Sequence, residues 1–152
     1  MRRVKGNATT DFGAPGAVPP DDEKPMRDAD LRRYRAMLRA YWRAFDEAVE
    51  SARGKKLAPG PRGGGRSLER IVDHVVEAER GYLSALGAKA PPSNASIEEV
   101  RDAVIEGMGS SARGEIPALG PRGGKRWKPR FFARRLGWHA LDHAWEIGDR
   151  AS

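Results

Sequence analysis

The chain has 152 residues and a mass of 16.7 kDa, which is enough for one domain with its own hydrophobic core. It contains no cysteine, which excludes disulfides, a cysteine nucleophile and cysteine metal ligands. Its 28 basic and 21 acidic residues give a net charge of +7, which favours acidic partners. No apolar run is long enough to cross a membrane and the N-terminus has no signal-peptide pattern, so we expect a cytoplasmic protein without membrane partners.

Residues 1–27 are rich in Gly, Pro, Asp and Thr and have no sustained apolar period. We therefore expect an irregular N-terminal extension or linker, part of which can lie across the surface of the folded domain. From Asp28 onward the pattern changes to regularly spaced apolar residues. This change predicts a single domain over residues 28–150.

Four amphipathic helices are expected in this domain, because apolar residues recur at spacings of three and four. The first begins at Asp28 and runs for about six to seven turns. The second follows the N-cap Ser67 and ends at Leu86, before Gly87. The inward positions predicted for these two helices are Leu31, Tyr34, Leu38, Tyr41, Phe45 and Ala48, then Leu68, Ile71, Val75, Ala78, Tyr82 and Ala85.

The third helix opens with a capping box of Ser96 and Glu99, and glycines at 107 and 109 are expected to interrupt it. The fourth covers residues 129–148, with Pro129 in its first turn. Since no strand candidate is present, the predicted fold class is all-α: a four-helix bundle with up-and-down topology, each helix antiparallel to its sequence neighbour. In that topology the second and fourth helices run in the same direction.

All three histidines of the chain fall on predicted inward faces. His139 and His143, in "GWHALDHAWEIGDR", are four residues apart and leave one side of the fourth helix, within reach of one ion. His74 lies on the second helix, and parallel helices would bring it to the other two. Three neutral imidazoles with an open position are typical of catalytic Zn²⁺, and Ni²⁺, Co²⁺ or Fe²⁺ would also bind. The alternative is three core histidines without a metal.

Acidic residues flank these histidines in two similar segments, "DHVVE" at 73–77 and "DHAWE" at 142–146. Glu77, Glu146 and Asp142 are therefore candidates to orient the imidazoles or hold a water, the alternative being that they face solvent. The zincin signature H-E-x-x-H is absent because Ala140 stands at the glutamate position. Metalloprotease chemistry of that kind is thereby excluded, and no catalytic residue is assigned.

Two similar glycine-rich loops, "GPRGGGR" at 60–66 and "GPRGGKR" at 120–126, precede the histidine-bearing helices. With those helices parallel, both loops would lie at one basic end of the bundle. Arg62, Arg66, Arg122 and Arg126 are the anion-binding candidates there, for a small molecule that carries a carboxylate or phosphate. The same end could instead hold nucleic acid, or the loops could be simple turns with solubilising arginines.

The segments "RIVDHVVEAERGYLSALG" and "RRLGWHALDHAWEIGDR" resemble the DinB/YfiT-like metalloenzymes. These four-helix bundles include thiol-dependent S-transferases and the mycothiol-dependent maleylpyruvate isomerase, and the resemblance covers residues 28–150. It implies a divalent metal held by His74, His139 and His143, and a metal-activated thiol or water that attacks an electrophile. It also implies that residues 1–27 are the remnant of a linker to an upstream module.

The function expected from the sequence is that of a divalent-metal-binding, thiol-dependent transferase, or a related hydrolase or isomerase. Its substrate would be small and acidic or electrophilic, and its thiol would be a low-molecular-weight cofactor such as mycothiol, because the chain has no cysteine. We expect a monomer or a homodimer. The alternative is a non-catalytic binding module for nucleic acid or for a protein partner.

Overall fold

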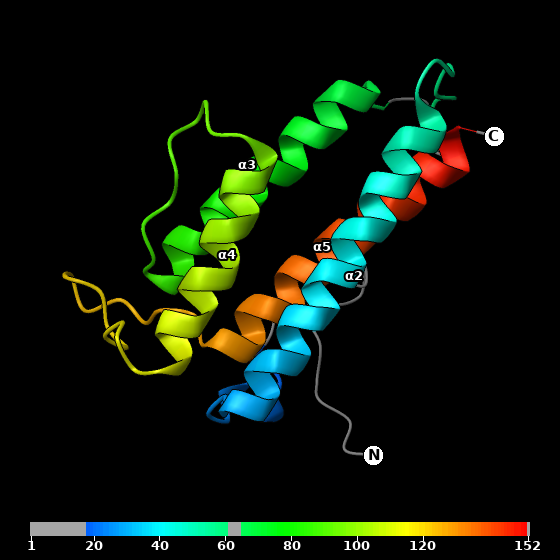
Figure 1. The fold of residues 1–152 in the computed structure, drawn as a ribbon. Helices are drawn as coiled ribbons and strands as arrows, with labels where there is room; N and C mark the ends of the chain where they lie inside the picture. Colours follow the sequence, from blue (N-terminus) through cyan, green and yellow to red (C-terminus); the bar gives the residue numbers. More distant parts are fainter. Residues whose placement is uncertain (1–17, 61–64, 152) are drawn as a thin grey trace.

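The computed structural model describes residues 18–60 and 65–151, and within these ranges it contains helices and no strand. The short 3₁₀-helix η1 (Pro20–Glu23) precedes four α-helices (Figure 1). They are α2 (Asp28–Ala52), α3 (Leu68–Leu86), α4 (Ile97–Ala112) and α5 (Pro129–Arg150). The predicted all-α four-helix bundle with an irregular N-terminal region is confirmed. None of the described helices is long and apolar enough to cross a membrane.

The helix ends follow the local signals in the sequence. The Ser67 hydroxyl accepts a hydrogen bond from the amide of Arg70, and Ser96 forms a reciprocal capping box with Glu99. The two glycines of α4 do not interrupt it, contrary to the prediction. A Cβ at Gly107 would lie 3.0 Å from the Cβ of Ala88, so its lack of a side chain lets α4 approach the segment after α3.

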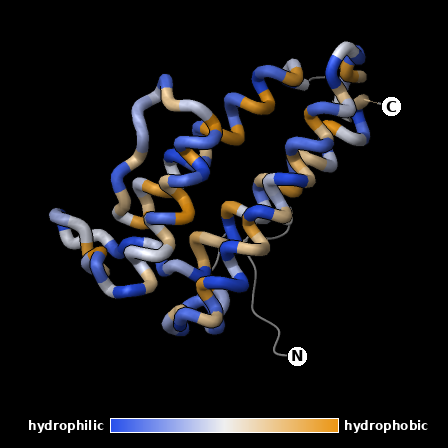
Figure 2. Tube along the Cα trace, in the orientation of Figure 1, coloured by the Kyte–Doolittle hydropathy of each residue, from blue (hydrophilic) through white to orange (hydrophobic). Residues whose placement is uncertain are grey.

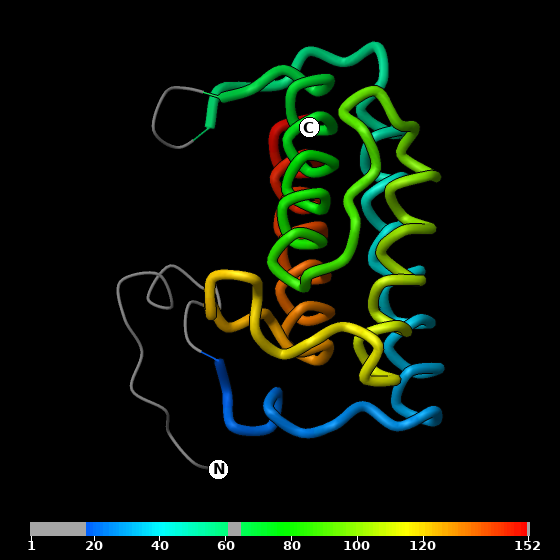
Figure 3. Tube along the Cα trace, turned by 90° about the vertical axis from the view of Figure 1, so that its left-hand side faces the viewer, coloured from blue at the N-terminus to red at the C-terminus, as the bar shows by residue number. Residues whose placement is uncertain are grey.

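The directions of the helices differ from the expected topology. In Figures 1 and 3, α2 and α5 run one way along the bundle, while α3 and α4 both run the other way. The hydrogen bonds agree, since Trp127 N–H donates to the Ala85 carbonyl and joins the start of α5 to the end of α3. At the other end of the bundle, Ala58 N–H donates to the Arg150 carbonyl. The histidine-bearing helices α3 and α5 are therefore antiparallel, and the predicted parallel arrangement is wrong.

The connection between α3 and α4 explains this difference. Residues 87–96 travel back along the bundle before α4 begins, as Figure 3 shows. Ten extended residues span about 33 Å, which exceeds the roughly 24 Å length of a 16-residue helix. The connection is thus long enough to return the chain to the end at which α3 started.

The core consists of two hydrophobic clusters along the bundle axis, and hydrophobic residues recur along each helix (Figure 2). The α2–α5 interface is the most extensive. On α5, Leu136 and Ala140 belong to one cluster, whereas Ala144 and Ile147 belong to the other. The clusters therefore meet at the level of the α5 histidines.

Two predicted inward faces need correction. On α2, Trp42 is buried, while its neighbour Tyr41 is only half-buried. On α3, Glu79, Leu83 and Leu86 are buried, whereas the predicted positions one residue earlier are half-buried. The buried face of α3 thus winds around the helix along its length, and α3 packs against both α4 and α5.

The described part of the N-terminal extension packs against the start of α5. Asp22 is almost fully buried and accepts two hydrogen bonds from Arg134, at 2.7 and 2.8 Å. Arg130 donates to the carbonyls of Lys24 and Pro25. Residues 20–25 therefore form part of the same packed body as the bundle.

Candidate metal centre

The three histidines meet between α3 and α5. The Nε2 atom of His139 lies 3.2 Å from Nε2 of His74 and 3.1 Å from Nε2 of His143. Ligand atoms from all three side chains lie within 4.8 Å of one another. The rings stand at steep angles, with centroids 4.5 to 5.0 Å apart, so they converge at their tips rather than stack.

This arrangement fits a divalent metal. Two nitrogen ligands of a tetrahedral Zn²⁺ are separated by about 3.3 Å. The Nε2–Nε2 distances from His139 to His74 and to His143 are close to this value. The Nδ1 atom of His143 lies 2.7 Å from Oε2 of Glu146, and a carboxylate there keeps the proton on Nδ1. The Nε2 lone pair of His143 is then free and directed at the other imidazoles, as a metal ligand requires.

Glu146 is held in turn by Arg150. The guanidinium of Arg150 donates to Oε1 of Glu146 at 3.0 Å, and to the backbone carbonyls of Ala58 and Arg66. Burial alone would raise the pKa of Glu146, but hydrogen bonds and charge from His143 and Arg150 lower it. Glu146 therefore stays ionised behind the imidazole that it orients.

The other two acidic candidates lie outside the site. Glu77 is exposed and forms an ion pair with Arg80 at 2.7 Å, one turn away on α3. Asp142 is also exposed. Of the three acids named from the sequence, the structure brings only Glu146 to the histidines.

The surroundings favour the neutral imidazole at His139 and at His74. Burial, followed by the proximity of His143 and His74, lowers the pKa of His139 to about 3. Burial and the charge of Arg66 lower the pKa of His74. Neutral imidazole is the form that binds a metal. His139 and His143 are buried and His74 is half-buried, so the site faces solvent on the His74 side.

Contrary to the prediction, the described arginines of the two glycine-rich loops do not form one basic end. Because α3 and α5 are antiparallel, Arg66 lies at the start of α3, while Arg122 and Arg126 lie near its far end. Arg126 donates to the Pro117 carbonyl, and Arg122 is exposed. Arg62 lies outside the described residues.

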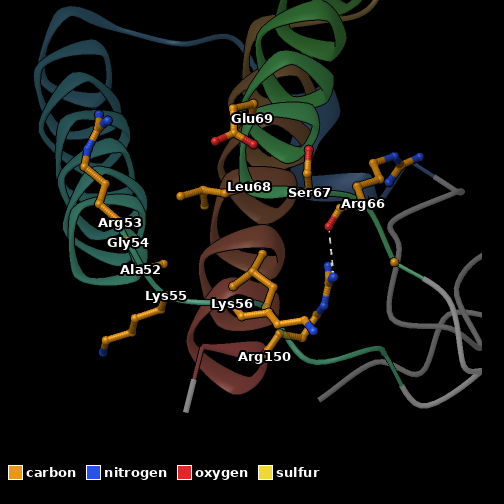
Figure 4. A pocket seen from close by; sticks show the side chains of 12 residues that line it. Ala52, Arg53, Gly54, Lys55, Lys56, Arg66, Ser67, Leu68, Glu69 and Arg150 are labelled. Carbon is orange, nitrogen blue, oxygen red and sulfur yellow. Dashed lines mark hydrogen bonds between the residues drawn. The ribbon is translucent and has the colours of Figure 1, made fainter.

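The cavity beside Arg66 is not a convergent anion site. In Figure 4, the side chains of Arg53, Lys55 and Arg66 point in different directions around it. The hydrogen bond drawn there runs from Arg150 to the backbone carbonyl of Arg66. A Cβ at Gly65 would collide with the Arg150 guanidinium, so one glycine of this loop allows Arg150 to reach its acceptors.

Sequence reasoning missed three residues of the site. Arg150 was not singled out, although it follows Glu146 by four residues and so shares its helix face. Tyr82 presents its ring at 89° to His139, with centroids 5.9 Å apart. Arg135 lies over the rings of Tyr82 and Trp138, at 5.9 and 5.3 Å. Arg135 precedes the candidate ligand His139 by four residues, and this spacing could have placed it beside the site from the sequence.

Comparisons with protein-family models, curated proteins and solved structures give no match for this chain.

Proposed function

We propose that this protein is a divalent-metal enzyme whose metal is held by His74, His139 and His143. The observation that carries the proposal is the convergence of the three histidines, with Nε2 of His139 at 3.2 Å from that of His74 and 3.1 Å from that of His143. Glu146 and Arg150 stand behind His143. A hydrogen-bonded carboxylate behind a ligating histidine is the usual support of such a site. Zinc is the first expectation because it is common, and nickel, cobalt or iron suit the same ligands.

The chemistry proposed is thiol-dependent transfer, or a related hydrolysis or isomerisation, on a small acidic or electrophilic substrate. A bound divalent metal lowers the pKa of a thiol or water that occupies its open position. Since the chain has no cysteine, the thiol would come from a small cofactor such as mycothiol. The resemblance of the α3 and α5 segments to the DinB/YfiT-like metalloenzymes supports this choice.

The protein's own residues would perform three tasks in this reaction. The three imidazoles bind the ion, and the half-buried His74 lies on the side from which a substrate enters. Glu146 keeps the proton of His143 on Nδ1, and Arg150 keeps Glu146 in place. The buried faces of His139 and His143 against the core limit access of water to the other side.

Elemental analysis tests the metal proposal. Protein purified without chelator, and protein reconstituted with Zn²⁺ and dialysed, should both contain about one metal per chain. A His139→Ala, His143→Ala double variant should lose it, while Glu77→Gln, at an exposed position on α3, should keep it. Wild-type protein without stoichiometric metal after reconstitution with zinc, nickel, cobalt or iron would contradict the proposal.

The alternative of a nucleic-acid-binding module loses its main support, because Arg66 and the 120–126 loop lie at opposite ends of α3. Binding at a single basic end would require them together. A steep fall of affinity with salt, reduced by Arg122→Ala and Arg126→Ala, would nevertheless favour that alternative.

A further inference from the structure

The guanidinium of Arg135 occupies an unusual position beside the three histidines. It precedes His139 by one turn of α5 and packs over the rings of Tyr82 and Trp138. The ring of Tyr82 also meets His139 edge to face. Arg135 therefore lies in the wall of the candidate metal centre, on a rigid helix and between two aromatic side chains.

Arg135 has no carboxylate partner, in contrast to many arginines of the bundle. Within residues 18–60 and 65–151, no acidic side chain forms an ion pair with it, and its Nη1 atom is buried without a hydrogen-bond partner. The arginines of these ranges that do pair with a carboxylate are Arg33, Arg53, Arg80, Arg101, Arg113, Arg130, Arg134 and Arg150.

A buried, unpaired donor of a charged group destabilises a fold, so its presence beside the candidate metal ligands points to a ligand that completes its hydrogen bonds. A guanidinium presents parallel N–H groups that match a carboxylate. The faces of Tyr82 and Trp138 restrict the orientation of this guanidinium. Little rotamer entropy is then lost when an anion binds.

We propose that Arg135 binds a carboxylate of the substrate or of the thiol, next to the metal-binding imidazoles. Arg135 and His139 are four residues apart on one helix, so their side chains are neighbours. The ligand that satisfies both is a small molecule with its metal-binding atom a few bonds from its carboxylate. A mercaptocarboxylate has this chemistry. The position of the ligand next to a metal rests on the proposed function. The binding of its carboxylate rests on Arg135 alone.

The test compares mercaptoacetate with its neutral amide, 2-mercaptoacetamide, as ligands of the Co²⁺-loaded protein. Both thiols give a thiolate-to-cobalt absorption band, which yields the dissociation constant of each. The wild type should bind the acid at least about tenfold more tightly than the amide. Arg135→Gln should remove this preference, and Arg135→Lys should keep a part of it. Arg43→Gln, which removes an exposed charge on α2, should leave it unchanged.

Equal acid-to-amide ratios in the wild type and in Arg135→Gln overturn the inference, provided that both bind one Co²⁺ per chain. If neither the wild type nor the variants bind cobalt, the proposed metal function fails. Carboxylate binding by Arg135 is then tested in the metal-free protein. Acetate should then shift the NMR signal of the arginine Nε–Hε group that Arg135→Gln removes, while acetamide should not. Absence of that shift overturns the inference.

Discussion

The substitution Glu79→Gln tests how the core between α2 and α3 is built. Glu79 is 2% exposed, accepts a 2.8 Å hydrogen bond from the Trp42 indole through Oε1, and has no partner for Oε2 in the described residues. Burial raises its pKa from the ordinary 4.5 to about 7, although Trp42 and Arg101 oppose the change. The folded state therefore prefers the protonated carboxyl.

The sign of the pH dependence follows from this shift. Because the folded pKa lies above the unfolded value, the stability contributed by Glu79 is complete below about pH 4.5 and falls as the pH rises to about 7. Ionising this carboxyl at pH 8.5 costs ~3 kcal/mol. Glutamine keeps an acceptor for Trp42 but does not ionise. Glu79→Gln should therefore be more stable than the wild type at pH 8.5 and similar to it near pH 4.5.

Urea denaturation of both proteins at pH 5 and pH 8.5 measures this effect. The difference in the free energy of unfolding should change by about 2.5 kcal/mol between the two pH values, because pH 5 retains a small part of the cost. Titration of other groups cancels in the difference. Glu47→Gln, at an exposed position on α2, should show no such change. A constant difference between wild type and Glu79→Gln would refute the reasoning.

Three further substitutions test other contacts. Glu146→Gln removes the carboxylate behind a candidate ligand, so Zn²⁺ affinity in a competition titration should fall about 10- to 100-fold, and an unchanged affinity would contradict that role. Gly137→Ala places a Cβ 2.6 Å from ring carbons of Tyr41, so urea unfolding should show a loss of ~1–3 kcal/mol, and wild-type stability would argue against this close packing. Asp22→Asn, which weakens the ion pair between the buried Asp22 of η1 and Arg134 of α5, should cost about 1–2 kcal/mol in a thermal melt. The exposed Asp21→Asn should cost much less, and equal losses would contradict the docking of η1.

The sequence correctly predicted four helices and the convergence of the three histidines, although it misjudged the helix directions. His139 and His143 are fixed by the period of one helix, which does not depend on topology. His74 lies about 9 Å from the start of α3, and His143 and His139 lie about 10 and 17 Å from the end of α5, so the antiparallel packing brings them to one level. The inward positions of the histidines therefore identified the site, although the helix direction assumed with them was wrong.

Other features depend on long-range packing that periodicity does not encode. The reach of residues 87–96 permits either direction of α4, so the length of this connection does not by itself predict the topology. Because the direction of α4, and with it that of α5, is opposite to the prediction, Arg66 lies far from Arg122 and Arg126. The predicted basic end is therefore absent among the described arginines. Burial of Glu79 was missed because a carboxylate at an inward position contradicts the usual pattern, and its partner Trp42 comes from another helix.

The pairing of α2 with α5 constrains the order in which the protein folds. These helices share the most extensive interface, yet more than seventy residues of chain separate the end of one from the start of the other. During synthesis the nascent chain must hold the apolar face of α2 without its main partner until residues 129–150 emerge. Two of the three histidines arrive with α5, so both the core and the candidate metal centre are completed only when that helix has emerged.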